Sequence, residues 1–255
     1  MLSAKRGIKA IFGHFGLEIR KISPPSPPAP GKFAWLKEFR IHTVLDIGAN
    51  TGQFVSSIFG QLPEARVYSF EPLRDVYEAL VKNCGAVKGF KGFNIALGDV
   101  NGWTKMNRSE FSPSSSLLKM GDLHKALYPY TAGTQREEIE MMRLDDFITR
   151  EGVNLEPEVL IKMDVQGYED RVLNGCRNTL ERTKVVITEV SFCDLYEEQA
   201  SFRDIYGQMQ NSGFVFKGIL EPEYDPVSGK PIFGDAIFVR ESSGGDGEKR
   251  QGRRE

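Results

Sequence analysis

The sequence has no long apolar run, few cysteines and little net charge, and each of these absences excludes a class of protein. No apolar stretch approaches the roughly 20 residues that a membrane-spanning helix needs. The three cysteines, Cys84, Cys176 and Cys193, lack metal-ligand spacing, and their odd number argues against a disulfide framework. A net charge of −2 over 255 residues gives no electrostatic reason to expect a nucleic-acid partner.

The two ends of the chain also lack features. The first six residues have no uninterrupted apolar core of a secretion signal, so with reduced cysteines we expect a cytoplasmic protein. Residues 241–255 are rich in glycine, serine and charge and contain no apolar side chain, which predicts a disordered tail.

The segment before the folded domain is predicted to have two parts. Residues 1–22 carry an apolar stripe at helical spacing, flanked by basic side chains. Such a helix suits contact with a membrane surface, or packing on the main domain or on a partner subunit of a homo-oligomer. Residues 23–31 are rich in proline and form a linker, so the main domain is predicted at 32–240.

Within the main domain, predicted strands and helices alternate, which indicates an α/β fold with a mostly parallel sheet and helices on both faces. Strands are predicted at 43–47, 66–70, 92–96, 159–163, 184–190, 214–219 and 235–240. Helices are predicted at 52–59, 74–84, 168–174 and 201–212. The last two strands are joined without a helical segment, which favours an antiparallel pair.

One long segment, residues 98–142, interrupts this alternation. It holds a serine-rich loop at 112–116 and a predicted edge strand at 138–143. Long insertions in compact domains are usually functional or mobile. Asp145 and Asp146 follow it as adjacent acids, which cap helices more often than they bind metal, and we predict no metal site.

The turn after the first strand indicates a site for an adenosine-bearing cofactor. Gly48 lets the backbone approach a ligand closely, and Gly52 opens the next helix. Glu71 ends the second strand 19 residues past Gly52, near the spacing of about 20 expected of a carboxylate that binds ribose hydroxyls. A surface acid at a strand end is the alternative for Glu71.

The same turn distinguishes between cofactors. Asn50 stands where a pyrophosphate-binding loop needs its second glycine, although Asn50 also suits a simple turn because it tolerates a left-handed backbone. Asp46 would repel a pyrophosphate but would attract the cationic amino-acid end of S-adenosylmethionine; alternatively it caps the loop amides. A seven-stranded sheet with a reversed last strand, the Rossmann-like class I methyltransferase fold, also favours S-adenosylmethionine over a nicotinamide cofactor.

Other polar residues follow the later strands. Leu97 and Asp99, at a Gly-Asp turn, are candidates for the adenine edge, or form an ordinary tight turn. Asp164 ends the fourth strand, where ligands of open α/β sheets bind, and is a candidate general base or substrate contact, with cofactor contact and helix capping as alternatives. Glu189 ends the fifth strand on the same rim and is a second catalytic candidate, since two carboxylates could divide the work of orienting a hydroxyl and accepting its proton. His124, in the insertion, either reaches the site as a base or is an exposed loop histidine.

Together these motifs resemble the FkbM-family methyltransferases over roughly residues 40–240. The resemblance rests on the order and spacing of 46–54, 70–72, 96–99, 115–116, 144–147 and 161–169. Gln166 and Tyr168 depart from the family, which usually has Glu and commonly has Ala at these positions, and they indicate an altered pocket wall. The resemblance implies S-adenosylmethionine-dependent O-methylation of a sugar, glycan, glycolipid or other small molecule, and it leaves the acceptor open.

Two other functions are compatible with the fold. A methyltransferase of proteins or nucleic acids is one, although no basic, aromatic-rich stretch favours nucleic acid. A non-catalytic module that binds S-adenosylmethionine is the other, and the presence of Asp46, Glu71 and Asp164 argues against it.

Overall fold

The computed structural model describes residues 31–241. The helix predicted at 1–22, the linker apart from Gly31, and the tail after Glu241 lie outside the described residues and stay predictions. The chain divides into two units, Met1–Ala34 and Trp35–Glu255, and the fold below is that of the second unit.

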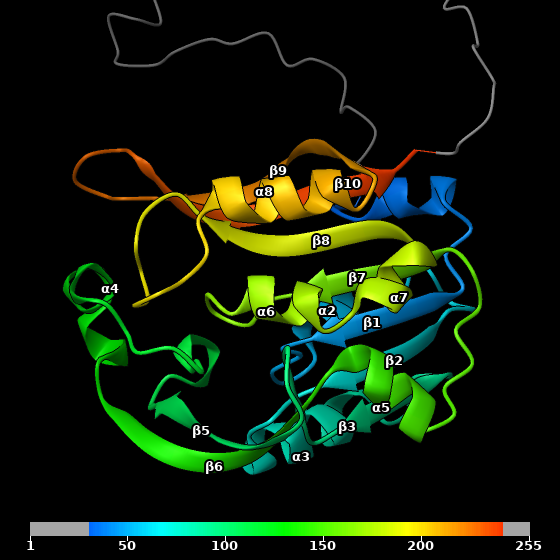
Figure 1. The fold of residues 1–255 in the computed structure, drawn as a ribbon, viewed down its shortest axis with the longest axis horizontal. Coiled ribbons are helices and arrows are strands. Elements are labelled where there is room, and N and C mark those ends of the chain that lie inside the picture. Colours follow the sequence, from blue (N-terminus) through cyan, green and yellow to red (C-terminus); the bar gives the residue numbers. More distant parts are fainter. Residues whose placement is uncertain (1–30, 242–255) are drawn as a thin grey trace, which may run out of the picture. The chain divides into compact units, whose positions relative to one another are not determined.

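A seven-stranded sheet forms the centre of this unit (Figure 1). The strand order is β3-β2-β1-β7-β8-β10-β9, and only β10 runs antiparallel to its neighbours. The strands are β1 (Thr43–Ile47), β2 (Arg66–Phe70), β3 (Phe90–Phe93), β7 (Val159–Met163), β8 (Thr183–Ser191), β9 (Phe214–Tyr224) and β10 (Pro231–Arg240). The predicted class I methyltransferase topology, with its reversed last strand, is therefore confirmed.

Helices connect the parallel strands. They are η1 (Ala34–Glu38), α2 (Gln53–Ile58), α3 (Arg74–Cys84), α5 (Leu144–Arg150), α6 (Glu169–Asn174), α7 (Arg177–Glu181) and α8 (Phe202–Asn211). The start of α8 shows why these sequences form helices where they do. Ser201 and Asp204 exchange side-chain and backbone hydrogen bonds in a capping box, which satisfies amides that the first turn leaves unpaired.

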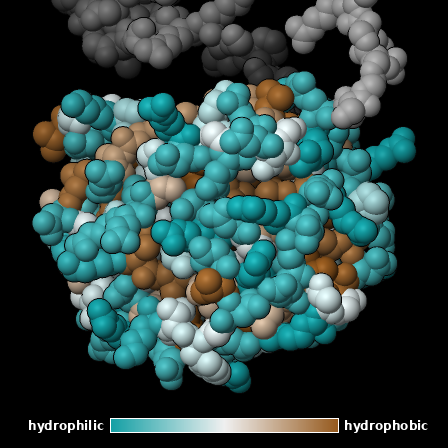
Figure 2. All heavy atoms as spheres, in the orientation of Figure 1, coloured by the Kyte–Doolittle hydropathy of each residue, from teal (hydrophilic) through white to brown (hydrophobic). Residues whose placement is uncertain are grey.

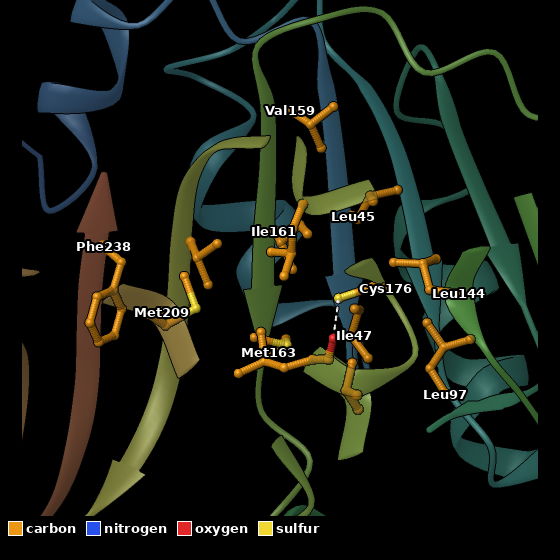
Figure 3. Close-up of a cluster of buried hydrophobic side chains, with 14 of the residues drawn as sticks. Leu45, Ile47, Leu97, Leu144, Val159, Ile161, Met163, Cys176, Met209 and Phe238 are labelled. Carbon is orange, nitrogen blue, oxygen red and sulfur yellow. Dashed lines mark hydrogen bonds between the residues drawn. The ribbon is translucent and has the colours of Figure 1, made fainter. Parts of the chain in front are cut away.

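Both faces of the sheet are buried. Alternate residues of the central strands, such as Leu45, Ile161 and Val186, pack with Phe147 of α5 and Met209 of α8 in one cluster, part of which is drawn in Figure 3. The residues between them point to the other face and are equally inaccessible: Val44, Leu160, Val185 and Ile187 are all 0% exposed. Burial on both faces explains why these strands are continuous apolar runs in the sequence.

The insertion forms a second, three-stranded sheet of order β4-β6-β5. Its elements are β4 (Ala96–Leu97), β5 (Gly102–Ser109), η2 (Ser112–Ser114), α4 (Asp122–Leu127), η3 (Pro129–Thr131) and β6 (Thr134–Met142). Two predictions are wrong here. The strand predicted at 92–96 ends at Phe93, and Ala96 instead pairs with β6; the predicted edge strand is the central strand of this sheet, because both β4 and β5 pair with it.

The surface of the unit is mostly polar on the face drawn in Figure 2, where hydrophobic residues reach the surface in separate spots. Among residues 31–241, no helix has the length and apolar character required to cross a membrane.

Candidate functional site

Four acidic residues lie at or directly after the carboxyl ends of adjacent strands of the large sheet. In the parallel register, Ile47 of β1 pairs with Phe70 of β2 and with Met163 of β7. Glu71 and Asp164 come directly after those two partners, and Glu189 lies near the end of β8. The sheet therefore brings together the acids that the sequence placed at separate strand ends, with Asp46 between them.

The turn after β1 lies against the end of β7. Gly48 has a φ of +77°, and a Cβ on it would lie 1.9 Å from the carbonyl oxygen of Asp164. Asn50 also has a left-handed backbone, with a φ of 45°, and its side-chain oxygen accepts a hydrogen bond of 2.9 Å from the Thr51 amide. The turn thus needs glycine at 48 and favours asparagine at 50.

Glu71 ties the turns after β1 and β2 together. Its carboxylate accepts hydrogen bonds from the backbone amides of Asn50 at 3.0 Å and Leu73 at 2.9 Å. Only 5% of the residue is exposed, and burial raises its pKa to about 7 although both hydrogen bonds lower it. Each carboxylate oxygen donates nothing and retains room for a further hydrogen bond, so hydroxyl donors of a ligand fit here.

Asp46 and Lys162 form the buried electrostatic centre of the site. Burial raises the pKa of Asp46 to about 6, and the Lys162 ammonium and a 3.1 Å hydrogen bond from Ser69 oppose that rise. Lys162 Nζ lies 3.4 Å from Asp164 Oδ2 and 3.6 Å from Asp235 Oδ1. Burial lowers the pKa of Lys162, but the surrounding carboxylates raise it above its ordinary value, so the ammonium stays charged.

Gln166 joins the two candidate catalytic acids. Its Nε2 donates to Asp164 Oδ1 at 2.8 Å and lies 3.3 Å from both carboxylate oxygens of Glu189. Burial raises the pKa of Glu189 well above its ordinary value, and the charges of Asp164 and Glu169 raise it further. Glu189 is only 9% exposed, whereas the Asp164 side chain is 41% exposed and reachable by a ligand.

The insertion closes over this edge through three hydrogen-bonded contacts. Ser116 Oγ donates to the Gln166 carbonyl at 2.7 Å, and Asn50 Nδ2 donates to Ser112 Oγ at 3.3 Å. The Tyr196 hydroxyl lies 2.8 Å from Gln166 Oε1 and 3.2 Å from the Ser114 carbonyl. The serine-rich loop marked in the sequence is thus part of the site wall.

Several residues of the site were not singled out in the sequence. Lys162, Asp235 and Tyr196 are the main ones. Lys162 lies within the motif around Asp164. An ionisable residue in an otherwise apolar, buried strand is the feature of the sequence that could have identified it as a site residue. Nothing local marks Tyr196 or Asp235, because their partners are 30 and 73 residues away in the chain.

The remaining predicted site residues lie apart from this group. Leu97 is 2% exposed and packs in the core of the large sheet, and Asp99 forms a 3.7 Å ion pair with Arg171. The expectation of an exposed loop histidine is wrong: His124 lies in α4 and is 4% exposed. Its ring packs 5.1 Å from that of Tyr196, and its role as a base stays a prediction. Cofactor contacts at Leu97 and Asp99 stay predictions.

The charge pattern decides which ligands the site suits. Most charged groups at the strand ends are carboxylates. The Lys162 ammonium lies among them and forms ion pairs with Asp164 and Asp235. A ligand with a cationic group and hydroxyl donors matches these carboxylates. A pyrophosphate would be repelled by the negative charges of Asp46 and Glu71. In residues 31–241, no three His, Cys, Asp or Glu side chains are arranged to hold a metal ion.

Comparisons with known proteins agree with this arrangement. Residues 46–216 match the family described as the methyltransferase FkbM domain. The 2-O-methyltransferase NoeI of Sinorhizobium fredii is 32% identical over 173 residues, which cover 64% of this chain and 68% of the relative. The methyltransferase sdnD of Sordaria araneosa is 27% identical over 154 residues, covering 52% of this chain and 59% of the relative.

Among solved structures, the methyltransferase FkbM from Methylobacillus flagellatus KT aligns with a TM-score of 0.48 at 13% identity. The alignment covers 78% of this chain and 44% of that chain.

Proposed function

Because the chain belongs to the FkbM methyltransferase family, we propose that it transfers a methyl group from S-adenosylmethionine to a hydroxyl of a sugar, glycan, glycolipid or other small molecule. The observation that carries the proposal is the grouping of Asp46, Glu71 and Asp164 at adjacent strand ends around the turn at 48–52. The name of the bacterial relative, a 2-O-methyltransferase, supports oxygen as the accepting atom.

The carboxylates of the site fit the proposed cofactor. Glu71 would accept hydrogen bonds from the ribose hydroxyls, because its carboxylate is held in place by two backbone amides. Asp46 and the turn at Gly48 would face the methionine portion. When bound, S-adenosylmethionine supplies an electrophilic methyl group on a cationic sulfur.

The acceptor hydroxyl loses its proton when it is methylated, and Asp164 would accept that proton as the general base. Gln166 and Lys162 each contact one of its carboxylate oxygens, which fixes the orientation of the carboxylate. Glu189, which also contacts Gln166 and is only 9% exposed, would orient the hydroxyl rather than take its proton. Alignment of the hydroxyl and removal of water would supply most of the remaining acceleration.

Glu71→Ala should weaken S-adenosylhomocysteine binding by about 10- to 100-fold, because charged hydrogen bonds to the ribose are lost. Isothermal titration calorimetry of the variant against wild type measures this. The 2′,3′-dideoxy analogue separates ribose binding from support of the turn: its affinity should fall clearly less in the variant, because it loses only the support of the turn.

Glu78→Ala is the matched control, because Glu78 is an exposed acid paired with Arg74 at 2.8 Å on α3. Equal losses for the ribose compound and its dideoxy analogue would contradict a ribose contact. Tight NAD binding without S-adenosylhomocysteine binding would contradict the cofactor assignment itself.

The acceptor class can be read from the chemical stability of the product. A host lysate incubated with the protein and methyl-labelled S-adenosylmethionine should take up label in a glycan, lipid or small-molecule fraction. The label should survive mild alkali, because hydroxyl methylation gives an ether and carboxyl methylation gives an ester. Label confined to protein or nucleic acid, or released by alkali, would contradict the proposal, and lysate incubated with heat-denatured protein is the control.

A cytoplasmic setting agrees with the cysteines, since Cys84, Cys176 and Cys193 are all free thiols. We propose that setting together with the function.

A further inference from the structure

A row of ring side chains runs through the insertion from the acidic edge to the surface. The ring of Tyr196 lies 5.1 Å from His124, which lies 5.3 Å from Tyr128. Tyr128 lies 6.4 Å from Tyr130, and Tyr130 packs edge-on against Phe111 at 5.5 Å. The row is continuous, so its outer members are held at a fixed distance from the site.

Both ends of the row are attached to the site. The Tyr196 hydroxyl lies 2.8 Å from Gln166 Oε1, beside Asp164. Phe111 directly precedes Ser112, whose hydroxyl accepts a 3.3 Å hydrogen bond from the side chain of Asn50 in the turn after β1. The row is therefore linked to the site at both ends, through Gln166 and through Asn50.

The outer pair differs from the inner members in exposure. Tyr130 is 63% exposed and Phe111 is 44% exposed, whereas Tyr196 is 3% exposed. The inner rings are explained by packing. The outer two keep large apolar surfaces in water at the outer end of a row that is linked to the site, which folding alone does not require.

We propose that Phe111 and Tyr130 form an aromatic platform that binds a sugar ring of the acceptor. The inference rests on the proposed function and specifies the acceptor class. A sugar has apolar C–H faces that pack on aromatic rings, and hydroxyls that need polar partners around its edge.

Polar groups next to the platform match the edge of a sugar and not an aliphatic chain. Tyr128, whose ring lies 6.4 Å from that of Tyr130, carries a phenol, and so does Tyr130 itself. Ser112, the residue after Phe111, adds a hydroxyl that contacts Asn50, so donors and acceptors lie beside the rings. An aliphatic acceptor would cover them without forming hydrogen bonds, at a cost in free energy.

Saturation-transfer NMR tests the platform directly on the full chain. The probes are the methyl glycosides of glucose, galactose and mannose and the disaccharides lactose, maltose and cellobiose. Phe111→Ala and Tyr130→Ala should each weaken binding of the recognised sugar by about tenfold, the loss expected when an apolar contact is removed. Tyr130→Phe keeps the ring and should retain most of the binding.

Trp103→Ala is the matched control, because Trp103 is a 71% exposed aromatic on β5 of the same small sheet. Unchanged binding in both platform variants, an equal loss in the control, or no sugar bound by the wild type would each overturn the proposal. The proposal would also be overturned if the wild type bound 1-octanol but no sugar and if the two platform variants lost the binding of 1-octanol.

Calorimetry with S-adenosylhomocysteine on the same proteins separates this inference from the proposed function. Platform variants should bind the nucleoside as the wild type does. A wild type that binds sugar through the platform but no S-adenosylhomocysteine would contradict the methyltransferase mechanism and leave the platform standing.

Discussion

Asp164→Asn should lower the rate of methyl transfer by about 10²- to 10⁴-fold, the contribution typical of a positioned general base. The amide has the shape of the carboxylate and keeps the hydrogen bond from Gln166 through its oxygen, but it does not accept a proton. S-adenosylhomocysteine affinity should stay within about threefold of wild type, because the fold of the turn after β1 is unaffected. The rate is measured as label incorporated into the acceptor fraction at saturating S-adenosylmethionine.

The structure gives a reason to choose Asp164 over Glu189 as the base. Glu189 is 9% exposed and its pKa is raised by burial and by neighbouring acids, whereas the Asp164 side chain is 41% exposed and can be reached by an acceptor hydroxyl. Glu189→Gln should therefore lower the rate of methyl transfer much less than Asp164→Asn does. Asp194→Asn, which changes an exposed acid, is the control. Equal rates for Asp164→Asn and wild type would remove Asp164 from the chemistry.

Gly48→Ala should prevent cofactor binding and lower the free energy of unfolding by more than about 4 kcal/mol. Such large losses are exceptional for single substitutions and are expected where a new atom overlaps backbone that is held in place. The added methyl group would lie 1.9 Å from the carbonyl oxygen of Asp164, and the φ of +77° is itself unfavourable for alanine. Neither atom can move alone, because the Asp164 amide donates to the Ile47 carbonyl at 3.0 Å. Urea unfolding and calorimetry with S-adenosylhomocysteine measure the two effects.

Gly60→Ala is the matched control, since a Cβ there meets nothing within 4 Å. It should leave the free energy of unfolding and the affinity near those of wild type. A Gly48→Ala protein that unfolds at the same urea concentration as Gly60→Ala would show that the turn after β1 can relax away from β7.

The sequence predicted the central sheet well because its strands are buried on both faces. The bounds of β1, β2 and β7 agree with the prediction, as continuous apolar runs between turn residues leave few alternatives. The strand ends also placed Asp46, Glu71, Asp164 and Glu189 at one edge, which follows from parallel topology alone.

The insertion was harder to predict because its strands are half-exposed and pair over long separations. Thr134 of β6 pairs with Ser109, whereas Met141 pairs with both Gly102 and Ala96, so no local pattern reveals the register. His124 shows the same limit: a polar helix of six residues gives no sign that its histidine is 4% exposed. Gln166 was noted for its departure from the family, but its contacts with two acids and a tyrosine required the fold.

The small sheet β4-β6-β5 pairs its strands only with one another, and its serine-rich loop meets the strand ends through the side chains of Asn50, Ser116 and Tyr196. One contiguous stretch of chain therefore borders the site, and under the proposed function it would shape the acceptor side, while separate strands of the large sheet supply the acids. Evolution can exchange this stretch for another and so change which molecule is methylated, provided that the few anchoring contacts survive. Divergence among relatives should accordingly concentrate between the strand that ends at Leu97 and the helix that begins at Leu144.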